Sequence, residues 1–303
     1  MTGTTGLETP IAPDVRGLSD GLPNGPSPRA GLWRPGHARL DVELVRGKST
    51  ATAACATNPL KLLIPRPRGP SVWAYTSNFG GGLVAGDETR LALNIGPGAR
   101  CFVSTQASTK IYRNPTGLPC SHLTHGVIGG DALLVFTPDQ VQPFAGSVYG
   151  QRQEWHLAER AGLVLLDWFG SGRAARGERW AFVRFQSRND IFMAGERIFV
   201  DSVWLDATDE ALSSPFRTGR FDCFAMLLFV GLPLSAFAEN ILREFSARPI
   251  ERRASLLCSA SQIRGGALLR LAGESTESVG RELRRQLHPL SSVLGDDPWQ
   301  RKW

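Results

Sequence analysis

A glycine-rich stretch from residue 77 to residue 113, SNFGGGLVAGDETRLALNIGPGARCFVSTQASTKIYR, constrains the fold of this chain more than any other part. Its three consecutive glycines, residues 80–82, are typical of backbone that turns tightly or approaches another segment closely. The run 91–95 alternates apolar with small or polar residues, which predicts a strand with one buried face. A second strand is predicted at 101–105. Because Gly96-Pro97-Gly98 separates the two, the pattern predicts a β-hairpin.

Short strands dominate the rest of the predicted structure. Period-two alternation, or enrichment in β-branched and aromatic residues, recurs down the chain between turn-forming residues. Gly129-Gly130-Asp131 separates two such runs and predicts a second hairpin. The predicted strands cover residues 38–45, 50–57, 60–64, 71–76, 91–95, 101–105, 121–128, 132–136, 148–157, 162–169, 179–187, 191–205, 255–261 and 267–271.

Helices are predicted only in the C-terminal region. Apolar residues recur at helical spacing near 234–247 and again near 276–288, the second run behind a candidate N-cap at Ser275 or Thr276. The 33 glycines and 20 prolines also favour many turns over long helices. The predicted fold class is therefore mainly β, with two helices in the C-terminal region.

The N-terminal segment differs in composition from the rest. Residues 1–32 are rich in Gly, Pro, Thr and Ser and hold few large apolar residues, so a disordered tail is predicted there. Residues 33–303 are predicted to form a single β domain. The net charge of +6 is scattered along the chain instead of clustered, which argues against a nucleic-acid-binding surface.

Cysteine usage and hydropathy predict a cytoplasmic protein that has no membrane segment. The five cysteines are widely spaced and never form a CxxC pair, which argues against a disulfide framework and a zinc ribbon. No charged segment followed by an apolar run opens the chain. The longest apolar tract, residues 224–238, is interrupted by Gly and Pro and is shorter than the roughly 20 residues that cross a bilayer.

Cys120, His122 and His125 are close in sequence, and a thiolate with imidazoles suits Ni²⁺ or Zn²⁺. A direct nickel carrier that uses these three residues is therefore one functional hypothesis. Their spacing opposes it, because an odd separation along a strand turns His122 and His125 to opposite faces.

A hydrolytic enzyme is a second hypothesis. Asp167, Glu178 and Glu154 could serve as paired carboxylates in a β-helical, polysaccharide-active enzyme. The lack of a fixed-period repeat argues against that architecture. The glycine loop is not followed by the Gly-Lys-Ser/Thr of a nucleotide-binding loop, so its default interpretation is a tight connection in which Asp87 bonds to local backbone.

The strings GGGLVAGD, GPGA, TQAS and TKIYR, in this order and interleaved with strands, resemble the signature of the urease accessory protein family UreD, also called UreH. The similarity continues into PDQVQPFAGSVYGQRQ at 138–153 and LLDWFGSGRAARGERWAF at 165–182, and covers roughly residues 37–235. The resemblance implies a mainly β fold whose strands wind into a helix-like stack of sheets.

The resemblance also implies a function without catalysis. Family members are expected to bind apo-urease, to recruit the helical accessory protein UreF and through it the GTPase UreG, and to help deliver nickel to the urease active site. Nickel would be in transit through an acid-lined internal channel, with no cofactor permanently bound. Asp87 and Glu178 match acidic positions that the resemblance assigns to this passage. Asp139 and Gln140 stand where many relatives have Gln-Glu, so one carboxylate of the passage is displaced or missing.

Five polar residues follow the predicted strand at 101–105 or end it. From composition alone they are solvated strand residues, whereas the family resemblance implies an interaction surface or an internal polar network. These residues are Thr105, Gln106, Lys110, Tyr112 and Arg113.

Overall fold

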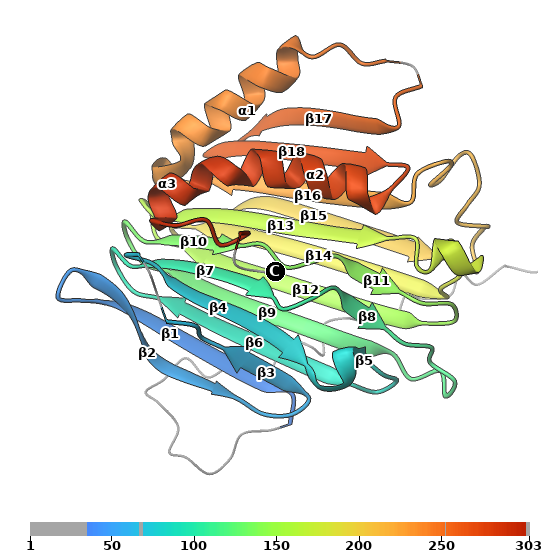
Figure 1. Ribbon diagram of the computed structural model, residues 1–303, viewed down its shortest axis with the longest axis horizontal. Coiled ribbons are helices and arrows are strands. Elements are labelled where there is room, and N and C mark those ends of the chain that lie inside the picture. Colours follow the sequence, from blue (N-terminus) through green and yellow to red (C-terminus); the bar gives the residue numbers. More distant parts are fainter. Residues whose placement is uncertain (1–34, 67–68, 252, 301–303) are drawn as a thin grey trace, which may run out of the picture. The chain divides into compact units, whose positions relative to one another are not determined.

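Two β-sheets form the body of the protein (Figure 1). The computed structural model describes residues 35–66, 69–251 and 253–300, so the tail predicted at 1–32 lies outside the described residues. The first sheet has seven strands, in the spatial order β15 (Glu196–Asp206), β14 (Arg184–Met193), β12 (Val148–Leu157), β9 (Cys120–Ile128), β6 (Glu88–Ile95), β1 (His37–Val45) and β2 (Lys48–Ala56).

The second sheet has eleven strands and faces the first. Its main path runs through β17 (Leu256–Ile263), β18 (Gly266–Gly273), β16 (Cys223–Val230), β13 (Gly162–Gly170), β10 (Leu133–Phe136), β7 (Arg100–Thr105), β4 (Val72–Asn78) and β3 (Leu60–Leu63). Three short strands, β11 (Val141–Pro143), β8 (Thr109–Ile111) and β5 (Gly82–Leu83), extend it beside β13. The mainly β fold class with stacked strands is thus confirmed.

Both predicted hairpins are wrong. β6 lies in the first sheet and β7 in the second, and β9 and β10 are divided in the same way. The Gly-Pro-Gly and Gly-Gly-Asp segments are corners that carry the chain from one sheet to the other. Each strand then pairs in parallel with the strand of the next coil, as β6 does with β9 and β9 with β12.

The corners stack on one another, which explains why they are rich in small residues. Ala99 N donates to Gly96 O in the first corner and Ala132 N to Gly129 O in the second, while Gly98 N donates to Gly130 O at 2.9 Å between them. A Cβ at Gly129 would lie 2.8 Å from the backbone nitrogen of Pro97, so a larger residue does not fit there.

The triple glycine is needed for local geometry. Gly80 and Gly81 have φ of 77° and 75°, values that side-chain-bearing residues rarely adopt. Gly82 pairs with Lys110, and a Cβ on it would meet the carbonyl oxygen of Lys110 at 2.3 Å. The loop therefore brings β5 against β8 at a distance that only glycine allows.

The strand boundaries predicted between residues 179 and 205 differ from those of the structure. The strands predicted at 179–187 and 191–205 are in fact β14 and β15, which meet at Ala194-Gly195. Both turn residues have positive φ, 50° and 84°, so the chain reverses there although Ala gives no clear turn signal. Residues before Arg184 belong to a loop in which Trp180 also has positive φ.

The helices cover the outer face of the second sheet. α1 (Ser235–Ala247) packs on β17 and β18, and α2 (Thr276–Leu287) on β16 and β18 (Figure 1). Both helices match the predicted positions, and the candidate cap at Ser275 is confirmed, because its Oγ accepts a hydrogen bond from Ser278 N. The short helix α3 (Ser291–Leu294) follows, with single 3₁₀ turns at Phe79–Gly81, Ala174–Arg176, Leu232–Leu234 and His288–Leu290.

The space between the sheets has an apolar half and a polar half. In the apolar half the inward side chains of the central strands include Leu93, Ile128, Leu157, Leu163 and Ile191, all nearly inaccessible to solvent. In the polar half the same strands present Thr89, His122, Gln151, Asp167 and Ser187. The polar half holds the candidate site.

Candidate functional site

A cavity of about 80 Å³ lies in the polar half between the two sheets. It has room for several water molecules, since one needs roughly 10–15 Å³ by the same measure. It is lined by Leu60, Thr76, Ser77, Asn78, Gly81, Leu83, Leu91, Thr105, Ala107, Ser108, Thr109, His122, Phe136, Pro138, Asp139, Val141, Tyr149, Gln151, Gln153, Asp167 and Trp168.

The lining residues differ in exposure, which defines a mouth and a deep end. Gly81 and Ala107 are exposed, and Ser108 beside them is half-buried. Gln153 and Asp167 are buried, with 3% and 8% of their surface exposed. The cavity therefore reaches the surface beside the glycine loop and ends among polar side chains inside the protein.

His122 is held in the deep part as a neutral ring. Its Nδ1 lies 2.7 Å from Thr89 Oγ1 and its Nε2 3.1 Å from Thr124 Oγ1. Burial lowers the pKa of His122 to about 4, because the charged imidazolium loses its hydration there. At neutral pH the ring therefore adds a polar but uncharged group to the cavity wall.

Asp167 is the most buried carboxylate of the cavity wall. Gln151 Nε2 and Asn189 Nδ2 donate to its oxygens at 2.7 and 2.8 Å, and the Ser187 hydroxyl donates as well. Burial raises the pKa of Asp167, although these three donors act in the opposite direction. The site thus combines a carboxylate with a network that orients it.

Two buried oxygen atoms at the cavity have no partner among the described residues. Gln153 Oε1 and Asn78 Oδ1 both belong to lining residues and accept no hydrogen bond from residues 35–66, 69–251 or 253–300. Buried acceptors are normally satisfied, and water in the cavity could supply the missing hydrogen bonds. Carboxylate, amide and hydroxyl oxygens are donors that suit a hydrated divalent ion.

The predicted polar group around Thr105 is divided by the structure. Thr105 Oγ1 donates to Asp139 Oδ2 at 3.0 Å and accepts from Asp139 N at 2.7 Å, which fixes part of the cavity wall. Tyr112 OH donates to Gly80 O at 3.1 Å and so braces the glycine loop. The remaining three lie elsewhere: Gln106 and Lys110 are exposed, and Arg113 packs beside Gly146.

The two acidic residues suggested by the family resemblance do not line this cavity. Asp87 Oδ2 accepts a hydrogen bond from Val84 N at 2.9 Å and so closes the loop after the glycines. Glu178 accepts from Arg173 Nε at 2.8 Å and from Ala145 N. Because Arg173 donates to it, the pKa of Glu178 lies below its ordinary value, and the carboxylate is ionised and paired.

Cys120, His122 and His125 do not come together as one ligand set. His122 faces the cavity, whereas His125 is on the opposite face of β9, next to Glu154 and His156. Cys120 is buried, its thiol donates to Val148 O, and burial raises its pKa to about 12. A protonated thiol is a poor metal ligand, so no three-residue carrier site is formed here.

The three carboxylates of the enzyme hypothesis are also separate. Asp167 is inside the cavity wall, Glu154 is on the outer face of β12, and Glu178 is in the loop that follows β13. A glycosidase needs two carboxyl groups on either side of one bond. These three do not face a common cleft.

Sequence reasoning missed the amides of the site. Gln151 and Gln153 alternate with charged residues along β12. Glutamines at the inward positions of a strand were the sequence feature that could have indicated a polar interior. Gln151 bonds to Ser187 of the neighbouring strand β14 and to Asp167 of the opposite sheet, so the sheet register and the facing of the two sheets together bring them into contact.

The helices of the described part of the chain are all too short or too polar to cross a bilayer.

Fold and site together define a class of protein, in which stacked strands of two sheets enclose a small polar space. The chain matches the UreD urease accessory protein family over residues 34–303. It is 45% identical over 276 residues to a urease accessory protein UreD of Sorangium cellulosum, covering 91% of this chain and 86% of that one. It is 38% identical to the UreD of an Anaeromyxobacter species (91% and 92% covered) and 34% identical to urease accessory protein D of Arabidopsis thaliana (86% and 98% covered). The chain belongs to the UreD family of urease accessory proteins.

Proposed function

We propose that this protein is a non-enzymatic maturation factor that passes nickel to apo-urease through the polar cavity. The observation that carries the proposal is the pair of buried oxygens, Gln153 Oε1 and Asn78 Oδ1, that accept no hydrogen bond from the described residues and line the cavity. Such acceptors can replace part of the hydration shell of a cation.

The side chains of the cavity wall suit the transit of nickel better than its storage. A conduit must bind an ion weakly enough to release it, and this wall offers oxygens and one neutral imidazole without a thiolate. The carboxylate of Asp167 already accepts three hydrogen bonds, which leaves it less free to hold nickel tightly. We infer that nickel is in transit there and that no cofactor is permanently bound.

Docking of the partners is proposed at the mouth of the cavity. Phe79, Val84 and Leu118 are exposed by 66%, 51% and 58%, and they surround the glycine loop beside the mouth. Exposed apolar side chains next to a functional opening favour a protein partner. The proposed partners are apo-urease, UreF and, through UreF, UreG, in the cytoplasm.

Blocking the mouth tests the proposal. Ser108→Trp places a large side chain at a half-buried position of the cavity wall, and Ser108→Ala is the size control. Nickel per urease is measured by mass spectrometry after activation with all accessory proteins, and complex assembly is followed by gel filtration. We expect Ser108→Trp to lower the nickel content of urease while assembly stays intact. Equal nickel with both variants would contradict the route.

A separate variant tests the acidic residues suggested by the family. Asp87→Ala with Glu178→Ala is expected to reduce nickel in urease without loss of the complex, if these carboxylates also guide the ion. Because Asp87 and Glu178 hold loops by local bonds, thermal unfolding of the double variant is measured in parallel. Unchanged nickel loading in a folded double variant would exclude Asp87 and Glu178 from the nickel route. It would not affect the test of the cavity by Ser108→Trp.

A further inference from the structure

A second polar cluster lies on the face of the first sheet that points away from the cavity. Glu154 and His156 of β12 are two residues apart and therefore leave the strand on one face, opposite to Gln153. His125 of β9 is paired in register with Glu154. One nitrogen of each histidine and one oxygen of the glutamate lie within 4.8 Å of one another.

The spacing within this cluster suits a single metal ion. His156 Nε2 and Glu154 Oε1 are 2.8 Å apart. Donor atoms bound at about 2.0–2.2 Å to one ion stand roughly 2.8–3.5 Å from each other at octahedral or tetrahedral angles. The rings of His125 and His156 have their centroids 5.3 Å apart, and one nitrogen of His125 already lies within 4.8 Å of the other two donor atoms.

The neighbouring strands place an aromatic ring against His156 and a small residue beside His125. Phe192 of β14 stacks on His156 with centroids 4.8 Å apart and planes 6° from parallel. On the other side, the residue of β6 in register with His125 is Ala92, which has only a methyl side chain. All three donors are half-buried, so an ion from solvent can reach them.

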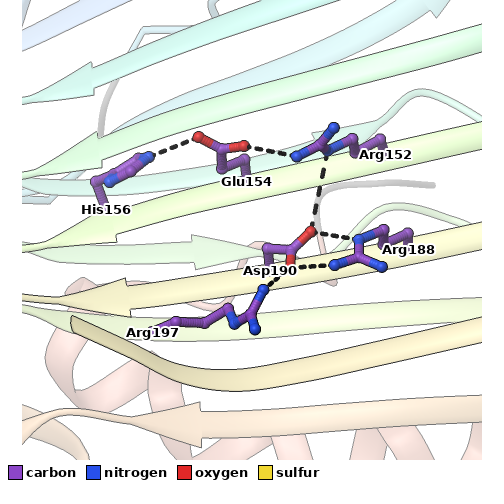
Figure 2. A network of polar contacts seen from close by, with 6 residues as sticks. All are labelled: Arg152, Glu154, His156, Arg188, Asp190 and Arg197. Carbon is purple, nitrogen blue, oxygen red and sulfur yellow. Dashed lines mark hydrogen bonds and ion pairs between the residues drawn. The ribbon is translucent and has the colours of Figure 1, made fainter. Parts of the chain in front are cut away.

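A network of charges behind the cluster orients the glutamate (Figure 2). Arg152 donates to Glu154 Oε2 at 3.2 Å, which leaves Oε1 directed at His156. Arg152 is itself 3.9 Å from Asp190, and Asp190 is held by Arg188 at 2.7 Å and by Arg197 at 3.8 Å. Partners of this kind fix the ligands of a metal and tune their basicity.

We propose that His125, Glu154 and His156 form a binding site for one divalent transition-metal ion of the Ni²⁺ and Zn²⁺ type. Two imidazoles and one carboxylate are the donors that such borderline ions prefer over Mg²⁺ or Ca²⁺. Three protein ligands leave the remaining positions to water, which makes the bound ion exchangeable. The site does not depend on the cavity route, because it lies on the opposite face of the sheet.

Metal titration of the untagged full-length chain tests the proposal. Ni²⁺ and Zn²⁺ are titrated by calorimetry into the wild-type protein and into His125→Gln with His156→Gln, with Mg²⁺ as the hard-ion comparison. We expect the double variant to bind one equivalent fewer of Ni²⁺ or Zn²⁺ and Glu154→Gln to weaken binding at least about tenfold. His288→Gln is the matched control, since His288 is also near a carboxylate, Asp297, at 3.2 Å but on the far side of the fold, next to α2.

A second readout keeps the proposal falsifiable if a variant unfolds. Diethylpyrocarbonate modifies accessible imidazoles, and mass spectrometry locates the modified residues in the wild-type chain. Zn²⁺ is expected to protect His125 and His156 but not His288. Equal stoichiometry in folded wild-type and double-variant protein, or modification of His125 and His156 that Zn²⁺ does not change, would overturn the site.

Discussion

The two halves of the space between the sheets are built by the same strands but have opposite character. β9 contributes His122 to the polar half and Ile128 to the apolar half, and β13 contributes Asp167 and Leu163 in the same way. The apolar half excludes water and stabilises the stack by burial. The polar half contains buried groups that cost free energy unless they are paired. This difference indicates that one half maintains the fold while the other serves the function.

The apolar half should be the more sensitive to truncation. Leu163 has no exposed surface and is packed between the sheets, so Leu163→Ala is expected to lower the free energy of unfolding by about 2–5 kcal/mol. Urea denaturation measures the change. The matched control is Leu44→Ala, at a residue that is 47% exposed, with an expected change within about 0.5 kcal/mol. Similar losses for the two variants would remove the distinction between core and surface on which the comparison rests.

The polar half should make the free energy of unfolding depend on pH in the acidic range. Because the pKa of His122 is about 4 in the folded protein and about 6.5 when unfolded, the unfolded state binds the proton first. The contribution of the neutral ring is therefore complete above pH 6.5 and is lost as the pH falls toward 4, by roughly 3 kcal/mol in total.

Denaturation at several pH values tests this prediction. We expect His122→Gln to flatten the loss of stability between pH 6.5 and 4 compared with the wild-type chain. Parallel curves for the two proteins would show that His122 is not the buried titrating group and that the polar half is more hydrated than the cavity suggests.

Replacing Gln153, whose side-chain oxygen is buried without a partner among the described residues, should cost little stability. Gln153 Oε1 accepts no hydrogen bond from the described residues, so Gln153→Leu removes no bond at that atom and supplies an apolar group of similar size. The free energy of unfolding is expected to change by less than about 1 kcal/mol in urea denaturation. A loss as large as that of Leu163→Ala would mean that the polar half also maintains the fold.

Much of the fold was accessible from sequence because strands and helices are local patterns. Alternation identified β1 and β6, enrichment in β-branched and aromatic residues identified β12, and helical spacing with the cap at Ser275 located α1 and α2. The two hairpin predictions were wrong because Gly-Pro-Gly and Gly-Gly-Asp also suit turns that carry the chain from one sheet to the other. The sequence of a turn does not determine whether the next strand joins the same sheet or the opposite one.

The site was less accessible, since its members meet only through the register of strands in one sheet and the facing of the two sheets. The odd separation of His122 and His125 did predict that they face opposite sides of a strand, as the structure has them. By contrast, Gln151 and Asp167 are 16 residues apart on strands of different sheets. No local spacing marks such a pair, and the cavity that they line follows from how the two sheets face each other.

The nickel content of urease activated with Gln153→Leu shows whether nickel crosses the polar half. Apo-urease is activated with all accessory proteins and either the wild-type chain, Gln153→Leu or the surface control Leu44→Ala, and nickel per active site is measured in complexes of equal composition. If nickel crosses the polar half, Gln153→Leu will load clearly less nickel than the other two proteins while it remains as stable as the wild type. Full nickel loading by a stable Gln153→Leu protein would show that nickel takes another route.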